Sequence, residues 1–171
     1  ITSLGWCDEI IIIDDYSEDG TIDKTRNSKL ETRIKSKIQI YKKHLNADFA
    51  KQRNYGLEKA TEEWVLFIDA DEVVTVELSN EIKQQIFYSE SEKWIPGQAR
   101  NDNKVAGFYV KRKDYFGGKW LKYGETAKVR LLRLGRKGKG RWVGKVHEVW
   151  EMEGKTKEIK NPILHYPHPT V

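Results

Sequence analysis

The sequence predicts an α/β fold in which a doubly wound sheet is followed by a mixed or antiparallel portion. Two short apolar runs, residues 10–13 and 64–68, each end in acidic residues. Segments with helical periodicity alternate with these runs, which is typical of an open parallel sheet covered by helices. Beyond residue 105 short strands alternate with Gly-rich turns, which favours antiparallel pairing.

The first strand is predicted at residues 10–13, where four consecutive isoleucines suit a short, apolar strand. Asp14 and Asp15 follow directly and are expected at the carboxyl end of that strand, where open α/β sheets bind ligands. A short helix over residues 21–28 and a further strand over residues 37–42 come next in the predicted order.

A second helix is predicted over residues 49–60, with Asn46 or Asp48 as its N-cap. Arg53 stands four residues before Leu57 and therefore shares the apolar stripe of this helix. Two explanations are open for a charge on that stripe. The side chain either extends along the surface to reach water, or it contacts an anionic ligand at the edge of the sheet.

The central stretch of the chain is an uninterrupted apolar run, residues 64–68, that ends in Asp69, Asp71 and Glu72. Such a run predicts a strand buried on both faces, with the acids just beyond it. In an extended chain Asp69 and Asp71 would share a face, and two carboxylates suit Mg²⁺ or Mn²⁺ bound to a phosphate. A polar turn that caps the next helix remains the alternative.

The rest of the chain is predicted from similar signals. Thr75 is expected to cap a helix that carries Leu78, Ile82 and Ile86 on one face. Residues 89–104 are rich in turn formers and are interpreted as a surface loop. Three short strands are then expected, at residues 105–110, 128–133 and 146–152.

Composition indicates a folded globular chain of 171 residues, with 38% hydrophobic and 33% charged residues. A single cysteine excludes a disulfide within the chain, and no apolar run approaches the ~18 residues of a membrane span. Residues 1–23 hold seven acids and no Lys or Arg, whereas residues 111–145 hold thirteen Lys or Arg and two acids. This asymmetry favours an anionic partner for the basic segment, with a solvated basic face as the alternative.

Several short motifs, taken in order, resemble the inverting family 2 glycosyltransferases of the GT-A fold. The resembling stretches are Asp14-Asp15-Tyr16-Ser17-Glu18-Asp19-Gly20-Thr21, Gln52-Arg53-Asn54, Phe67-Ile68-Asp69-Ala70-Asp71-Glu72 (the family's DXD motif), Tyr115-Phe116-Gly117-Gly118-Lys119-Trp120, Val129-Arg130-Leu131-Leu132-Arg133 and Val146-His147-Glu148. The later ones are similar to the subgroup that contains bacterial lipopolysaccharide-core glycosyltransferases. Together they cover nearly the whole chain.

The resemblance implies a nucleotide-sugar donor and a divalent cation. Asp14 and Asp15 would hold the base and ribose, with Arg53 nearby. Asp69 would contact the ribose, and Asp69 and Asp71 would hold Mg²⁺ or Mn²⁺ on the diphosphate. The cation would assist departure of the nucleoside diphosphate as a Lewis acid.

Inversion requires one base that deprotonates the acceptor hydroxyl. Glu148 is the first candidate because it follows the family's V-H-E pattern, and Glu125 and Asp114 are the alternatives. His147 and Arg130 are expected to contact the acceptor. An ion pair of His147 with Glu148 at a strand end is the competing structural interpretation. His165 and His168 are expected at the surface, with phosphate or metal contacts as the alternative.

The resemblance also implies a division of the chain into a nucleotide-sugar-binding half, residues 1–88, and an acceptor-binding half, residues 105–171. Residues 1–171 are expected to form a single glycosyltransferase domain that is an N-terminally truncated fragment with little or no activity. The reason is that the family's first strand is missing before the region that matches Ile1.

The expected function is metal-dependent transfer of a hexosyl group to a phosphorylated glycan or glycolipid, in cell-envelope polysaccharide or lipopolysaccharide biosynthesis. The expected location is the cytoplasm, at the inner face of the cytoplasmic membrane, with peripheral membrane contact and no nucleic acid. The alternatives are a metal-dependent nucleotidyltransferase and a non-enzymatic module whose basic half binds nucleic acid.

Overall fold

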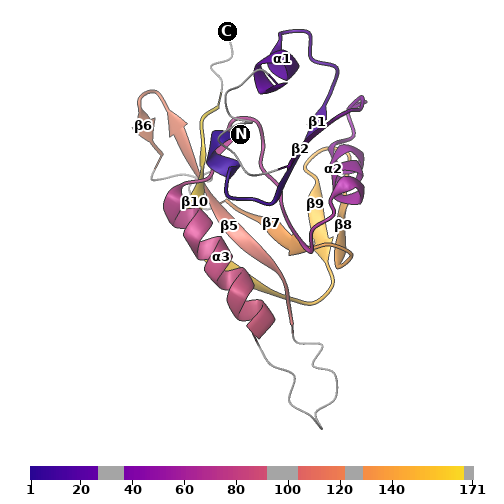
Figure 1. Ribbon diagram of the computed structural model, residues 1–171. Helices are drawn as coiled ribbons and strands as arrows, with labels where there is room; N and C mark the ends of the chain where they lie inside the picture. The colour runs from indigo at the N-terminus through magenta and orange to yellow at the C-terminus, as the bar shows by residue number, and fades with distance from the viewer. Residues whose placement is uncertain (27–36, 92–103, 122–128, 168–171) are drawn as a thin grey trace. The chain divides into compact units, whose positions relative to one another are not determined.

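A computed structural model describes four stretches of the chain (Figure 1). They are residues 1–26, 37–91, 104–121 and 129–167. The chain divides into two compact units, and each is built from two separate stretches. The first unit comprises Ile1–Glu63 and Gly140–Glu151, and the second comprises Trp64–Lys139 and Met152–Val171.

The first unit pairs a parallel two-stranded sheet with helices. Its elements are a 3₁₀ turn at Thr2–Leu4, β1 (Glu9–Asp14), α1 (Thr21–Arg26), β2 (Lys37–Lys42), α2 (Phe49–Lys59), β8 (Gly140–Val143) and, crossing its boundary, β9 (Val149–Met152). β1 and β2 run parallel, in register from Glu9 opposite Lys37 to Asp14 opposite Lys42. β8 and β9 form a separate two-stranded sheet. The predicted order of strand, helix, strand and helix is confirmed.

Helix α2 is fixed at its start by a side-chain cap and along its length by a close approach to β1. The Asp48 carboxylate accepts a hydrogen bond from the Lys51 N–H at 2.9 Å, so Asp48 is the N-cap of the two candidates. At Gly56 an added Cβ would stand 3.4 Å from the Ile13 side chain, an ordinary van der Waals contact, so the helix lies directly against the strand. The apolar core of the unit then includes Ile10, Ile22, Ala50, Leu57, Ala60, Trp142 and Trp150.

The second unit is a mixed sheet covered by one long helix. Its elements are β3 (Trp64–Leu66), β4 (Glu72–Val73), α3 (Val76–Ser91), β5 (Val105–Phe116), β6 (Lys119–Trp120), β7 (Arg130–Arg136) and β10 (Lys155–His165). The strand order is β3-β7-β5-β10-β4, with β6 paired to β5. β5 and β10 are parallel, and the other pairs are antiparallel. The predicted α/β class with a mixed, largely antiparallel later portion is confirmed.

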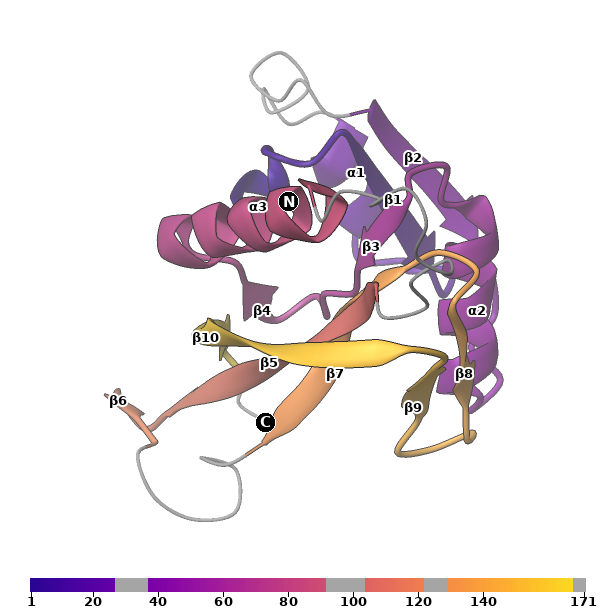
Figure 2. The ribbon, with the colours of Figure 1, turned by 90° about the horizontal axis from the view of Figure 1, so that it is seen from below.

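Helix α3 packs against β10 (Figures 1 and 2). The Thr75 hydroxyl accepts a hydrogen bond from the Leu78 N–H, which confirms Thr75 as the cap. Leu78 and Ile82 are fully buried. The Glu81 carboxylate also accepts hydrogen bonds from the backbone N–H groups of Lys160 and Asn161, at 2.8 and 2.9 Å. The helix is therefore held to β10 by apolar contact and by one bridging carboxylate.

The central apolar run differs from its prediction. Strand β3 ends at Leu66, and residues 64–69 are half-buried rather than buried on both faces. The reason is that β3 is an edge strand among the described residues and pairs only with β7, in antiparallel fashion. In the same way β1 pairs only with β2 among the described strands. The expectation that a family strand is missing beside β1 and β3 stays a prediction.

Other boundaries also shift. Helix α3 runs to Ser91, past the predicted start of the loop, and residues 92–103 lie outside the described part of the chain. The 146–152 strand begins only at Val149. β8 and β10 were not predicted. Within the described stretches, no helix is both long and apolar enough to cross a bilayer.

Candidate functional site

Asp14, the last residue of β1, is buried in the first unit and shapes the turn that follows. Its two carboxylate oxygens accept hydrogen bonds from the Ser17 N–H at 3.3 and 3.2 Å. Its backbone carbonyl accepts from the Lys43 N–H, next to β2. Buried carboxylates in proteins are normally hydrogen-bonded, and here the bonds fix the loop between β1 and α1. Asp14 therefore positions the residues around it.

Asp15 is half exposed and lies beside a pair of stacked aromatic rings. Its Oδ1 accepts a hydrogen bond from the Leu45 N–H at 3.0 Å and lies 3.4 Å from Nδ1 of His44. The His44 ring stacks on Tyr16, with centroids 4.0 Å apart and planes 20° apart. Tyr16 has φ +55°, a left-handed conformation that is uncommon for a non-glycine residue. An accessible carboxylate beside a stacked pair can hydrogen-bond the polar edge of a flat ligand ring.

Arg53 and Glu148 meet in a part-buried ion pair within the first unit. Arg53 Nε donates to Glu148 Oε1 at 2.8 Å, and each side chain is 15% exposed. The guanidinium lies over the Trp142 ring at 4.7 Å, and Trp142 stacks on Trp150. The charge on the apolar stripe of α2 is therefore matched by a carboxylate from the turn between β8 and β9. His147, the neighbour of Glu148, is exposed and has φ +56°.

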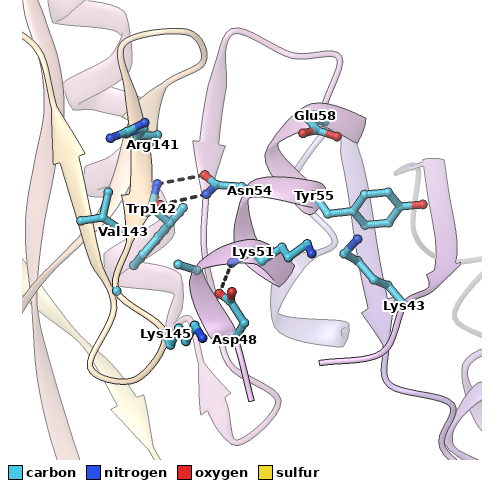
Figure 3. Close-up of a pocket in the computed structure, with 12 residues that line it drawn as sticks. Lys43, Asp48, Lys51, Asn54, Tyr55, Glu58, Arg141, Trp142, Val143 and Lys145 are labelled. Atoms are coloured by element: carbon cyan, nitrogen blue, oxygen red, sulfur yellow. Dashed lines mark hydrogen bonds between the residues drawn. The ribbon is translucent and has the colours of Figure 1, made fainter. Parts of the chain in front are cut away.

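A separate cavity of about 490 Å³ lies on another face of α2 (Figure 3). Lys51, Asn54, Tyr55 and Glu58 line it at i, i+3, i+4 and i+7 spacing. The Asn54 amide exchanges two hydrogen bonds with the backbone of Trp142, which ties α2 to β8. The remaining lining residues are Lys43, Asp48, Ala50, Arg141, Val143, Gly144 and Lys145. The cavity wall thus carries both signs of charge, with cations in excess.

In the second unit, Asp69 and Glu72 share one buried cation. Arg133 on β7 donates to Asp69 Oδ2 at 2.6 Å and lies 3.2 Å from Glu72 Oε1. The side chains of Arg133 and Glu72 are 4% and 0% exposed, and that of Asp69 is 36% exposed. Glu72 also accepts a hydrogen bond from the Asp69 N–H, and its own N–H donates to the Asp69 carbonyl. This closes a tight turn directly after β3.

Burial raises the pKa of the Glu72 carboxyl above its ordinary value, although the positive charge of Arg133 acts in the opposite direction. The charge of Asp69 adds to the increase, and the hydrogen bond from the Asp69 N–H reduces it. Glu72 therefore has a structural role, and the positive charge of Arg133 stabilises its ionised form.

Asp71 faces a histidine that another carboxylate holds in place. His165 Nε2 lies 3.2 Å from Asp71 Oδ2, and His165 Nδ1 lies 2.6 Å from Asp114 Oδ1. Arg112 Nε lies 2.9 Å from the same Asp114 oxygen. An imidazole whose Nδ1–H is held by a carboxylate presents Nε2 as a ligand, which is the usual arrangement at protein metal sites. The sequence favoured a surface position for His165, with a phosphate or metal contact as the alternative. It comes from the end of β10, a strand that was not predicted.

The carboxylates of Asp69 and Asp71 have different partners, Arg133 and His165. The chain leaves β3 at Leu66 and turns at residues 70 and 71, so the extended conformation assumed for a shared face ends before Asp69, and joint metal binding by the two carboxylates stays a prediction. Among the described residues no three His, Cys, Asp or Glu side chains converge as metal ligands. Asp71 and His165 nevertheless offer one oxygen and one nitrogen. Mg²⁺ and Mn²⁺ at phosphate sites commonly use few protein ligands and complete their shell with water and phosphate oxygens, so these residues fit such a cation.

The other predicted residues are dispersed. Arg130, at the start of β7, pairs with Glu158 on β10 at 3.0 Å, and Lys111 pairs with the same carboxylate. Asp114 is buried against His165 and Arg112, which does not suit a base that must reach a substrate. Glu125 and His168 lie outside the described residues.

Comparison with known proteins gives two kinds of relative. The SPbeta prophage-derived glycosyltransferase SunS of Bacillus subtilis (strain 168) is 40% identical over 74 residues, which cover 43% of this chain and 16% of the relative. The lipopolysaccharide core biosynthesis glycosyltransferase LpsC of Rhizobium meliloti (strain 1021) is 28% identical over 170 residues, which cover 97% of this chain and 56% of the relative. The chain thus spans between about a sixth and just over half of the length of these curated relatives.

The family match covers both units. A family model described as glycosyl transferase family 2 matches residues 7–135. This stretch contains Asp14, Asp15, Arg53, Asp69 and Asp71, whereas Glu148 and His165 lie beyond its end. Because the match extends over most of the sequence, the chain belongs to glycosyl transferase family 2.

Proposed function

We propose that this chain is part of an inverting, metal-dependent enzyme that transfers a hexosyl group from a nucleotide sugar to a phosphorylated glycan or glycolipid. The observation that carries the proposal is the pair formed by Asp71 and His165. A partly exposed carboxylate, within the stretch that the family model matches, faces an imidazole that Asp114 orients. These two side chains would form a suitable binding site for a cation that also binds a diphosphate.

The residues of the first unit would bind the nucleoside. Asp15 is exposed beside the Tyr16–His44 stack, and Asp14 holds the loop that carries it. A carboxylate can accept hydrogen bonds from a base or a ribose, and stacked rings offer a flat apolar surface. Arg53 is placed in the same unit but is paired with Glu148.

Asp71 and His165 would hold Mg²⁺ or Mn²⁺, and Asp69 would contact the ribose. When bound, the cation would neutralise negative charge on the departing nucleoside diphosphate. Asp114 would keep the His165 ring in its orientation. The tie between Arg133 and Asp69 favours Asp71 over Asp69 as the main ligand.

Glu148 would take the proton of the acceptor hydroxyl. The Arg53 N–H on Oε1 fixes the orientation of this carboxylate, and Oε2 would serve as the base. His147 and Arg130 would contact the acceptor. The basic segment 111–145 would meet an anionic group of that acceptor, in envelope polysaccharide or lipopolysaccharide biosynthesis, at the cytoplasmic face of a membrane.

A ligand panel tests this function. The chain would be heated with nucleoside diphosphate sugars, the matching nucleoside diphosphates and nucleoside triphosphates, each with and without Mn²⁺. A ligand at a hundredfold excess over its Kd stabilises the folded state by about 2.7 kcal/mol, which raises the melting temperature measurably. We expect stabilisation by one nucleoside class that requires Mn²⁺, is lost in Asp71→Ala and is kept in Glu158→Ala.

Two outcomes would contradict the proposal. Stabilisation by triphosphates, with release of pyrophosphate on turnover, would indicate a nucleotidyltransferase. Salt-sensitive binding of oligonucleotides without any nucleotide-sugar binding would indicate a nucleic-acid-binding module.

A further inference from the structure

The end of β5 and the short strand β6 form a tight hairpin that extends from the sheet of the second unit. In Figures 1 and 2 this hairpin, residues 113–121, projects beyond the edge of the sheet formed by β5, β7 and β10. Tyr115 pairs with Trp120, and Phe116 pairs with Lys119. Gly117 and Gly118 make the turn with φ +56° and +81°, a conformation that two-residue hairpin turns require and that glycine adopts without strain. The hairpin is therefore a projection with a defined tight turn.

The apolar side chain at the tip faces water. Phe116, directly before the glycines, is 69% exposed, and Leu121 is 37% exposed. A single exposed phenylalanine is not unusual on a protein surface. Here, however, it belongs to the last strand pair before the turn of a projecting hairpin. A phenylalanine at such a position can be buried without moving the rest of the unit.

Three larger aromatic rings lie behind the tip. Tyr115, Trp120 and Tyr166 contact one another with centroids 5.0–5.5 Å apart. Tyr and Trp rings are enriched at the boundary between lipid headgroups and hydrocarbon, because each has an apolar body and a polar tip. The order of residues along the hairpin, with phenylalanine at the tip and Tyr and Trp behind it, matches the order of polarity across such a boundary.

The charge that remains at the hairpin is positive. Lys111 is paired with Glu158, and Arg112 is paired with Asp114. In the described stretches no carboxylate lies within ion-pair distance of Lys113 or Lys119. Lys113 instead lies over the Trp120 ring at 5.0 Å. Two uncompensated ammonium groups beside an exposed aromatic tip suit an anionic lipid surface, where each basic residue adds to binding.

We propose that this hairpin docks on an anionic lipid bilayer, with Phe116 inserted at the interface and Lys113 and Lys119 on headgroup phosphates. The inference deepens the proposed function and rests on it for its purpose, because a glycolipid acceptor would lie in that bilayer. The Tyr166 N–H donates to the Asp71 carbonyl, and the Leu121 N–H donates to the Asp114 carbonyl, each at 2.9 Å. Docking of the hairpin would thus hold Asp71 close to the membrane.

Vesicle binding tests the proposal. The chain would be sedimented with large vesicles of equimolar phosphatidylglycerol and phosphatidylethanolamine, and with vesicles of phosphatidylcholine alone. We expect binding to the anionic vesicles that weakens with added salt. Phe116→Ser should lower the partition coefficient roughly tenfold, and Lys119→Gln about fivefold. The matched control is Phe87→Ser, which removes an equally exposed phenylalanine, 66% exposed, from helix α3 and should leave binding unchanged.

The outcomes of these experiments distinguish a wrong docking site from a wrong proposed function. Equal binding by wild type and Phe116→Ser, equal losses in Phe116→Ser and Phe87→Ser, or absence of binding by wild type would reject the docking site. Circular dichroism and thermal melting establish that each variant is folded. Both phenylalanines are exposed, so we expect their replacement by serine to leave the fold intact. If vesicle binding fails while the Mn²⁺-dependent stabilisation by nucleotide sugars is present, the docking site is wrong and the proposed function survives. If nucleotide sugars do not stabilise the chain but vesicle binding depends on Phe116, the membrane-docking site is supported and the proposed function is wrong.

Discussion

Replacing Arg133 with methionine should destabilise the second unit, because it leaves a buried carboxylate without its cation. Methionine keeps much of the apolar stem of Arg133, so the main change is electrostatic. Removal of one partner from a buried ion pair costs about 3–5 kcal/mol. Asp69 is 36% exposed and can be rehydrated, whereas the Glu72 side chain is 0% exposed. We therefore expect a loss of about 3 kcal/mol, arising mostly from Glu72.

The loss should depend on pH in a defined direction. Burial already raises the pKa of Glu72, and loss of the opposing charge of Arg133 raises it further. A group whose pKa is raised by folding stabilises the folded state below its unfolded pKa, here 4.5, and this contribution is lost as the pH rises through the folded pKa. The deficit of Arg133→Met relative to wild type should be greatest at neutral pH and should shrink in acid.

Urea denaturation followed by circular dichroism, at neutral pH and at mildly acidic pH, measures both effects. The matched control is the double variant Arg133→Met/Glu72→Gln, in which the neutral amide can still accept the Asp69 N–H. It should recover most of the lost stability. An unchanged urea midpoint in Arg133→Met, or a deficit that grows as the pH falls, would refute the reasoning.

Four further predictions follow from single residues. Asp71→Ala should abolish Mn²⁺-dependent binding of nucleoside diphosphate in calorimetry, and unchanged binding would reject it as the main ligand. Glu148→Gln should lower turnover on the order of 10²-fold with donor binding nearly intact, because the amide is not a base; near-normal turnover would remove Glu148 from that role. Gly107→Ala should cost about 1–3 kcal/mol in thermal unfolding, since the new Cβ would meet the Leu134 carbonyl oxygen at 3.1 Å, and an unchanged melting temperature would contradict this. Glu81→Ala should cost about 1 kcal/mol at neutral pH. Partial burial acts to raise the pKa of Glu81, but hydrogen bonds from β10 hold this pKa below 4.5. The stability deficit of Glu81→Ala should therefore shrink as acid protonates the wild-type carboxylate. A deficit that does not change with pH would contradict this prediction.

The sequence predicted those elements whose signals are local. Four consecutive isoleucines marked β1, and Asp48 and Thr75 marked the starts of α2 and α3. Strand β10 was missed because Asn161-Pro162 interrupts its pattern. The structure accommodates this interruption by a shift in register between Ile159 and Ile163, where Glu81 takes up the free N–H groups. The interruption of β10 is thus compensated by a carboxylate from helix α3, and no local signal in the sequence predicts this contact.

The candidate site shows the same limit. For Arg53 the sequence offered a side chain that reaches water or an anionic ligand, whereas its observed partner is the Glu148 carboxylate, 95 positions away. His165 and Asp71 are 94 positions apart, and the sequence favoured a surface position for His165 over a phosphate or metal contact. Motif order located Asp14, Asp69, Asp71 and Glu148 individually. Which acids are tied to a guanidinium and which face an imidazole depends on strand pairing, so the different partners of Asp69 and Asp71 could not be predicted from the sequence.

The interleaving of the two units has a consequence for synthesis of the chain. Because residues 140–151 belong to the first unit, the polypeptide crosses between units three times. Chains emerge from the ribosome N-terminal end first. When residue 63 has emerged, Arg53 still lacks Glu148, and α2 still lacks the Trp142 strand to which Asn54 bonds. The nascent first unit therefore lacks these two contacts until most of the second unit has been translated. For the same reason neither unit can be excised from the chain by a single cut.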